Sequence, residues 1–267
     1  DVDPMFVDTA NGNYHLLASS QLINAGHPDS LDSDGTVADI GTYSYLNSYS
    51  GPTWYISESG NDTTATGASG DPFRSIQAAL NFGNDNDTAF VAEGLYNENL
   101  VYRYDESESV RNVSLIGEDR ETTIIDGQNN GICIKLPTNG YSSPLIKGFR
   151  IRNGYANGQM ENGQFNQGGG VMVDHNYLVS LHDLIIENCT AVMGGGAGIG
   201  GGIFSVTSSL DILNVNLNQN TAESGGGMYF SHESSVLITN TTISNNTADA
   251  DGGGIRGQNS NITLTNC

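Results

Sequence analysis

The C-terminal two thirds of the chain repeats one short pattern of apolar and polar positions. Runs of three to five residues alternate between apolar and polar side chains, which is the period of a β-strand and not that of a helix. Gly-Gly-Gly triplets precede several of these runs, at 168–170, 200–202, 225–227 and 252–254. The triplets are 32, 25 and 27 residues apart. This spacing predicts stacked repeats, each bent at a glycine corner.

Alignment of the repeats predicts columns of side chains that run along the stack. One apolar column contains Ile151, Ile186, Leu217, Ile243 and Leu264. Two polar columns contain Asp183, Asn214, Asn240 and Asn261, and Asn153, Asn188, Gln219, Asn245 and Asn266. Amides repeated at one position can hydrogen-bond between coils, and Asn tolerates the left-handed conformation of a tight turn. Because no coil buries its apolar face alone, stacking supplies the core. The pattern predicts an all-β fold, a parallel β-helix.

Residues 51–267 are expected to form this domain, with an N-terminal cap at about 54–87 and coils from about 88 to 267. Apolar residues at 73, 76, 79, 80 and 82 have helical spacing and predict a short helix over 73–82. Asp71 is the expected N-cap, with Pro72 at the first helical position. This helix would cover the open end of the core and protect an exposed strand edge.

Two segments resemble known bacterial proteins. The run from Tyr55 to Leu100 resembles the N-terminal cap and first coil of secreted pectate-lyase-like β-helix proteins. Coils with Gly-Gly-Gly-Ile and Ile-Ser-Asn-Asn-Thr-Ala are similar to the GGA(I/L) and FxxN repeats of chlamydial polymorphic outer-membrane proteins, with Ile or Leu in place of Phe. The resemblance covers about 54–267 and implies a right-handed parallel β-helix that is secreted or at the cell surface. That architecture hosts lyases, hydrolases, adhesins and passive stalks, so it does not fix a function.

Residues 1–50 resemble the tail that closes such β-helix modules, although here they precede a helix. They are expected either to close a preceding module or to pack along the outside of the helix that follows. The last repeat stops inside a coil at Cys267. Both ends therefore suggest a piece of a larger repetitive protein.

The net charge of the chain limits the classes of partner that it is expected to bind. Lys and Arg number 9 against 30 Asp and Glu, a formal net charge of −21. This balance argues against nucleic acid and anionic membranes, because phosphate contacts need a basic face. It is compatible with metal cations, with neutral glycans, or simply with a solvated acidic surface. No apolar run is long enough to predict a membrane span.

Candidate catalytic residues follow from the resemblance, because uronate lyases on this fold use an Arg or Lys base near calcium-binding carboxylates. The basic candidates are Lys147, Arg150, Arg152 and Arg256. Other titratable candidates are Asp174, His175, His182, Asp183, His232 and Glu233. The alignment predicts no coil in which two carboxylates and an Arg converge on one sheet.

Candidate ligand-binding residues are Phe204, Tyr229 and Arg256, which the alignment places in three successive coils. A basic residue beside stacked aromatic rings could bind a sugar. The same residues could equally form an aromatic ladder covered by a snorkelling Arg.

A candidate calcium site lies at Asp29, Asp32, Asp34 and Asp39, since close carboxylates on a turn suit this ion. The EF-hand pattern is not met, and an Asp-rich turn that satisfies its own backbone is the alternative. The three cysteines are Cys133, Cys189 and Cys267. The alignment places the last two in one column about 14 Å apart, beyond the disulfide limit of about 7 Å, so they are expected to act as small hydrophobes.

These patterns favour a secreted or cell-surface scaffold that binds a polysaccharide or a surface protein. A polysaccharide lyase or another glycan-active enzyme is the first alternative. A self-assembling fibre unit, with coils stacked head to tail between copies, is the second.

Overall fold

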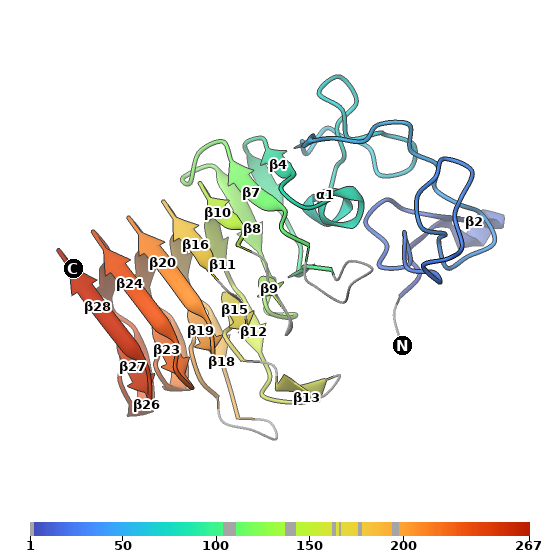
Figure 1. Ribbon diagram of the computed structural model, residues 1–267. Coiled ribbons are helices and arrows are strands. Elements are labelled where there is room, and N and C mark those ends of the chain that lie inside the picture. The colour runs from blue at the N-terminus through green and yellow to red at the C-terminus, as the bar shows by residue number, and fades with distance from the viewer. Residues whose placement is uncertain are drawn as a thin grey trace.

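The chain is a right-handed parallel β-helix, which confirms the predicted fold class (Figure 1). The computed structural model describes residues 3–103, 111–136, 143–161, 164–165, 167–175, 178–193 and 198–267. Strands of successive coils lie side by side and follow one another in steps from β4 to β28 near the C-terminus (Figure 1). Among the described residues no helix has the length and apolar character needed to cross a membrane.

Four parallel sheets run along the stack. Sheet 1 contains β3 (Thr53–Ile56), β4 (Thr88–Val91), β7 (Ser114–Gly117), β10 (Leu145–Lys147), β16 (Val179–His182), β20 (Ser209–Leu213), β24 (Ser235–Thr239) and β28 (Asn261–Thr265). Sheet 2 contains β5 (Gly94–Tyr96), β8 (Thr123–Asp126), β11 (Arg150–Arg152), β17 (Ile185–Glu187), β21 (Asn216–Asn218) and β25 (Thr242–Ser244). Sheet 3 contains β6 (Leu100–Val101), β9 (Ile134–Leu136), β15 (Val171–Asp174), β19 (Ile203–Val206), β23 (Met228–Ser231) and β27 (Ile255–Gln258). Sheet 4 is shorter, with β12 (Tyr155–Ala156), β18 (Thr190–Ala191), β22 (Thr221–Ser224) and β26 (Thr247–Asp251).

The glycine triplets form the corners that lead into sheet 3. The first glycine of each triplet is left-handed, with φ of +73° at Gly168, +68° at Gly200, +64° at Gly225 and +66° at Gly252. A Cβ at Gly200 would also lie 2.4 Å from the carbonyl oxygen of Ile203, which is too close for a carbon atom. These positions therefore require glycine for both conformation and space.

Four members of the predicted apolar column are confirmed, because Ile151, Ile186, Leu217 and Ile243 are direct partners in sheet 2. The placement of Leu264 is wrong. It pairs with Ile238 in sheet 1, and the last segment is β28, not a sheet 2 strand. The error arose because the similar runs Ile-Thr-Leu-Thr and Thr-Thr-Ile-Ser occur on different sides of the coil. Only the number of residues between each run and its glycine corner shows which side the run occupies.

The same shift corrects the last polar positions. The amide of Asn266 donates to Asn240 Oδ1 at 2.7 Å, so Asn266 continues the column of Asp183 and Asn214. Asn261 instead lies beside Ser235. Most corner residues of the two polar columns have φ between +51° and +57°, the left-handed conformation expected for Asn at a turn. The residues with these angles are Asn153, Asp183, Asn188, Asn214, Gln219, Asn240, Asn245 and Asn266.

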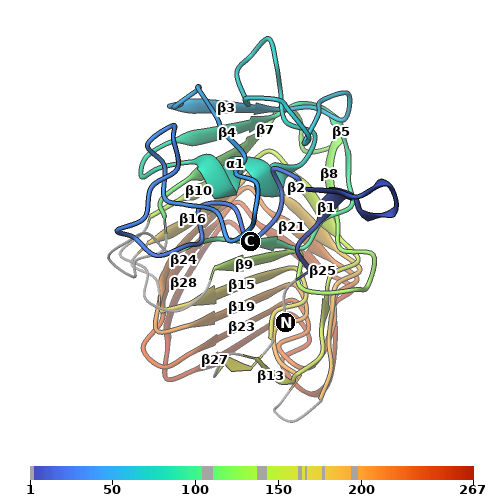
Figure 2. The same ribbon diagram turned by 90° about the vertical axis from the view of Figure 1, so that its right-hand side faces the viewer.

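The capping helix α1 spans Ile76–Phe82, so the predicted start at residue 73 is wrong. Phe73 lies before the helix and forms a parallel β-bridge with Ile56. The Asp71 carboxylate accepts the N–H of Thr66 and does not cap a helix. All seven residues of α1 are buried. The helix lies across the interior at the N-terminal end of the stack, as predicted (Figure 2).

Residues 3–50 pack against α1 at this end of the stack (Figure 1). The segment includes the hairpin of β1 (Phe6–Asp8) and β2 (Asn13–Leu16). The amide of Asn81 in α1 donates to the carbonyl oxygens of Ala18 and Ser20, both at 2.9 Å. Tyr45 lies 5.4 Å from Phe82 between ring centroids and donates to Ala65 O at 2.6 Å. That the segment closes a preceding module stays a prediction.

Candidate functional site

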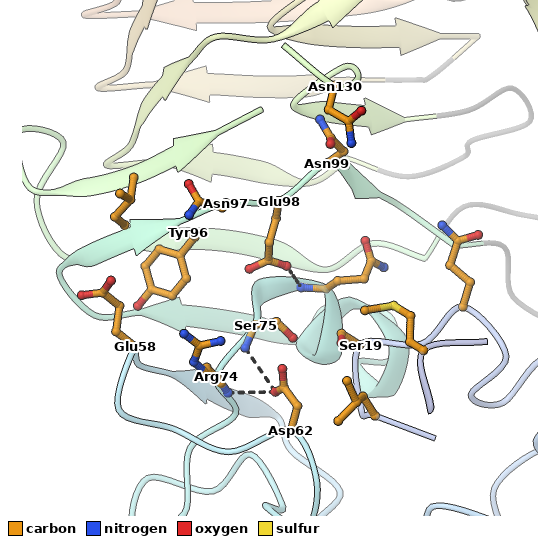
Figure 3. Close-up of a pocket in the computed structure, with 15 residues that line it drawn as sticks. Ser19, Glu58, Asp62, Arg74, Ser75, Tyr96, Asn97, Glu98, Asn99 and Asn130 are labelled. Carbon is orange, nitrogen blue, oxygen red and sulfur yellow. Dashed lines mark hydrogen bonds between the residues drawn. The ribbon is translucent and has the colours of Figure 1, made fainter. Parts of the chain in front are cut away.

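A pocket of about 570 Å³ lies where the N-terminal segment, the cap and the first coil meet (Figure 3). Its walls come from the segment around Ser19, the turn after β3, the residues before α1 and the loop between β5 and β6. Most of the lining side chains are polar: Ser19, Gln21, Glu58, Asp62, Arg74, Ser75, Gln77, Tyr96, Asn97, Glu98, Asn99 and Asn130, with Met5, Leu17 and Leu95 completing it.

Two carboxylates on this wall hold the chain where α1 begins (Figure 3). Asp62 Oδ1 accepts the backbone N–H groups of Arg74 at 2.9 Å and Ser75 at 3.2 Å. The Glu98 carboxylate accepts the N–H groups of Ile76 at 2.8 Å and Gln77 at 2.9 Å. These N–H groups have no partner within the helix, so Glu98 replaces the side-chain cap that Ser75 does not supply. Sequence spacing missed this cap because Glu98 lies more than twenty residues along the chain from the two N–H groups that it accepts.

Burial raises the pKa of Glu98 to about 7, while its two backbone hydrogen bonds oppose the shift and the nearby Asp62 adds to it. Burial also raises the pKa of Tyr96, and the charges of Glu58 and Glu98 contribute in the same direction. The Tyr96 hydroxyl therefore stays protonated at neutral pH and donates to Ala92 O at 2.9 Å.

One hydroxyl in the lining stands out. Ser75 Oγ is buried and has no hydrogen-bond partner within the described part of the chain. A buried hydroxyl without a partner loses free energy that a ligand or a water could restore. Around it, the side chains of Glu58, Arg74 and Asn97 are exposed. The pocket thus offers hydroxyl, amide and carboxylate groups with an excess of negative charge.

The predicted catalytic arginines lie elsewhere, on the outward face of sheet 2. Arg150 contacts Glu121 at 2.5 Å and Glu187 of the next coil at 2.9 Å, and Arg152 contacts Asp126 of the preceding coil at 2.7 Å. The prediction concerned single coils, and the two acids at Arg150 do come from the coils on either side of it. The parallel register brings acids from neighbouring coils together.

These contacts shift the pKa values of Asp126 and Arg150 in the directions that favour their charged forms. Burial alone would raise the pKa of Asp126, but hydrogen bonds from the Asn153 side chain, the Gln128 N–H and Arg152 outweigh it and lower that pKa. Burial alone would lower the pKa of Arg150, but Glu187 and Glu121 outweigh it and raise that pKa. An Arg with a raised pKa is a poor general base, because it must first lose its proton.

The remaining basic and imidazole candidates are dispersed. Lys147 is exposed on β10 in sheet 1, beside His182 of the next coil. His182 Nε2 lies 3.0 Å from Asp211 Oδ2, and His175 contacts Asp174 in sheet 3. The structure does not bring Lys147 together with the two arginines of sheet 2. His232 and Glu233 occupy the turn between β23 and β24, both with positive φ.

The predicted aromatic column exists. Phe204, Tyr229 and Arg256 are successive partners in sheet 3. The two ring centroids are 6.2 Å apart, and the Arg256 guanidinium carbon lies 5.9 Å from the Tyr229 ring centroid. However, Phe204 is 4% exposed and Tyr229 6%, in a small hydrophobic cluster with alanines of sheet 4. Arg256 also pairs with Asp251. The ring faces are not open to a sugar, and the geometry matches the alternative of an aromatic ladder.

The carboxylates of Asp32, Asp34 and Asp39 accept hydrogen bonds from the loop to which they belong. Asp32 accepts the N–H of Asp39 and the hydroxyl of Ser44, and Asp34 accepts the N–H of Asn47. Asp39 accepts the N–H groups of Asn24 and Tyr45, while Asp29 is exposed. Within the described ranges, no group of three or more His, Cys, Asp or Glu is placed to hold a metal ion. The geometry favours the alternative of a self-satisfied turn over the calcium site.

Comparison with known proteins gives distant structural neighbours. No protein-family model matches the sequence, and none of the curated proteins matches it. The pectin methylesterase PemA from Erwinia chrysanthemi is similar over 73% of this chain and 56% of its own, with 13% identity and a TM-score of 0.40. A pectin methylesterase solved in complex with a hexasaccharide is similar over 83% of this chain and 68% of its own, with 12% identity and a TM-score of 0.42. The chain thus spans little more than half of the first neighbour's length.

Proposed function

We propose that the chain is a rigid extracellular β-helix scaffold that binds neutral glycans in the pocket at its N-terminal end. The observation that carries the proposal is the polar lining of this pocket of about 570 Å³, with the unpartnered Ser75 hydroxyl in it. Hydroxyl, amide and carboxylate groups are the donors and acceptors that sugar hydroxyls need. Leu95, which is 40% exposed, adds an apolar surface for the carbon face of a sugar ring.

Charge decides between neutral and acidic glycans. Three carboxyl groups, those of Glu58, Asp62 and Glu98, line the pocket with one guanidinium, that of Arg74. With a pKa of about 7, Glu98 carries only part of its charge at neutral pH. The whole chain carries a formal charge of −21. The negative charge of the pocket and that of the whole chain both repel uronate polymers, whereas neutral sugars carry no charge to be repelled. This supports neutral glycans as ligands over pectin-type chains.

The paired outward charges support a scaffold over a lyase. Arg150, Arg152 and Arg256 each contact a carboxylate, and the partners of the first two come from neighbouring coils. The contacts of Arg150 and Arg152 join neighbouring coils, and the acids beside Arg150 raise its pKa. A lyase would need one of these residues as a free base near its substrate.

The test is isothermal titration calorimetry with neutral oligosaccharides of glucose, mannose, xylose and galactose, against oligogalacturonates. We expect saturable binding of a neutral series and none of the uronates. Ser75→Ala and Asn97→Ala should each weaken binding by about three- to tenfold, the effect of one lost hydrogen bond. Ser75 makes no side-chain cap bond, so its loss leaves α1 intact. Thr263→Ala, an exposed hydroxyl in β28 at the other end, is the matched control.

Two outcomes would contradict the proposal. One is the absence of binding by the native sequence across the neutral panel. The other is binding that Ser75→Ala and Asn97→Ala leave unchanged. If the chain instead released unsaturated products from uronates, detected by ultraviolet absorbance, the lyase alternative would replace it.

A further inference from the structure

Two cysteine thiols meet in the interior of the β-helix. Cys133 directly precedes β9, and Cys189 directly precedes β18 in the following coil. Both are completely buried, whereas Cys267 is exposed. The alignment of repeats placed Cys189 and Cys267 in one column, but β28 lies in sheet 1, so that column does not exist. The register of the coils leaves Cys133 as the neighbour of Cys189.

Their sulfur atoms are anchored one coil apart. Cys133 Sγ lies 3.3 Å from the carbonyl oxygen of Arg152, and Cys189 Sγ lies 3.3 Å from that of Glu187. Arg152 and Glu187 are direct partners in β11 and β17, and adjacent strands are about 4.8 Å apart. Gly170 precedes Val171, the partner of Ile134, and so lies beside Cys133 in the next coil. A Cβ on Gly170 would lie 3.3 Å from Cys189 Sγ, so the two thiols flank the same interior space.

Glycines surround the two sulfurs. A Cβ on Gly154 would lie 2.8 Å from Cys133 Sγ, and one on Gly127 would lie 2.9 Å from the same atom. A Cβ on Gly170 would lie 3.3 Å from Cys189 Sγ. None of these three positions therefore places a side chain between the thiols. Isolated small hydrophobes would not need to meet in this way.

We propose that Cys133 and Cys189 form a disulfide that links two successive coils from the inside. A low-molecular-weight disulfide is the oxidant. One cysteine thiolate attacks it, forms a mixed disulfide and releases one small thiol. The second cysteine thiolate then displaces the other small thiol, so the protein loses two protons and two electrons and the oxidant becomes two thiols.

The link forms while the chain folds. In the folded chain, contact with Cys189 and burial raise the pKa of the Cys133 thiol, which suppresses the reactive thiolate. The oxidant also has no access to completely buried sulfurs. Once formed, the bond closes the segment between residues 133 and 189 and restricts the unfolded chain, which stabilises the fold.

The experiment uses the full chain with Cys267→Ser, which removes the exposed thiol. The protein is refolded from denaturant in mixed oxidised and reduced glutathione, then denatured and alkylated. We expect no free thiol, a mass about 2 Da below that of the reduced chain, and a peptide joined through Cys133 and Cys189. Reduction should lower the thermal midpoint on the order of 10 °C.

A second variant separates the link from the loss of a side chain. Cys133→Ser combined with Cys267→Ser should show one free thiol, that of Cys189, and a midpoint that reductant does not change. Two free thiols in the Cys267→Ser protein after refolding would overturn the proposal. A disulfide that joins two chains instead of Cys133 and Cys189 would overturn it equally. The decisive thiol count is made on the Cys267→Ser protein, which keeps Cys133. A folding defect caused by Cys133→Ser therefore does not affect that test.

Discussion

At the scale of single residues, Glu98 connects the fold to the pocket. Its carboxylate caps α1 through two backbone N–H groups and also lines the pocket (Figure 3). Its pKa of about 7 exceeds the value of 4.5 that it has when unfolded. Between these values the folded chain binds a proton that the unfolded chain does not. The stability that this proton contributes is fully present below pH 4.5 and is lost as the pH rises through 7.

Replacement of Glu98 by Gln should remove this pH dependence. We expect the unfolding free energy of the native sequence, relative to Glu98→Gln, to fall as the pH rises from 4.5 to 7.5, by on the order of 3 kcal/mol. Urea denaturation of both proteins at pH 4.5, 6.0 and 7.5 measures this difference, in which the other titrating groups cancel. A difference that stays constant over this range would show that Glu98 has an ordinary pKa.

At the scale of elements, the coil corners set the close approach of neighbouring strands. A Cβ on Gly154 would lie 1.9 Å from the carbonyl oxygen of Gly169, which is backbone and cannot move aside. Gly154→Ala should therefore destabilise the fold by about 3 kcal/mol or more. Gly70→Ala is the matched control, since a Cβ there meets nothing within 4 Å.

Thermal and urea denaturation of both variants measure the contrast between these two glycines. Gly70→Ala should change stability by less than about 1 kcal/mol, in the stabilising direction if at all. Equal effects of the two substitutions would mean that the corner relaxes easily. In that case the strict occurrence of glycine at the corners would need another explanation.

The sequence predicts elements best where its period is regular. The columns of Ile186 and Leu217 followed from alignment, because period 2 within strands and glycine corners between coils act locally. Leu264 was misplaced because two sides of the coil carry similar strand sequences, and only counting from Gly252 separates them. Contacts between segments outside the repeats, such as that of Glu98 with α1, leave no periodic signal. The pocket is built from such contacts, so the sequence did not reveal it.

At the scale of the whole molecule, two electrostatic effects act in opposite directions. Thirty acidic residues against nine basic ones repel one another and favour expansion of the chain. The pairs around Arg150 and Arg152 act locally, and their side chains are between 9% and 58% exposed. Added salt screens long-range repulsion between exposed charges, while partly buried pairs are screened less.

We therefore expect salt to stabilise the chain at neutral pH. Raising NaCl from about 20 mM to about 500 mM shortens the Debye length from more than 20 Å to about 4 Å, which removes most of the repulsion. The thermal midpoint at pH 7 should rise by several degrees. The control is the same titration near pH 4.1, the isoelectric point of the sequence, where little net charge remains to be screened. Because sodium chloride also acts weakly on apolar burial, only the excess at pH 7 over pH 4.1 measures repulsion. A midpoint that falls with salt at pH 7 would mean that ion pairs between coils, and not the overall charge, dominate the electrostatic stability of the solenoid.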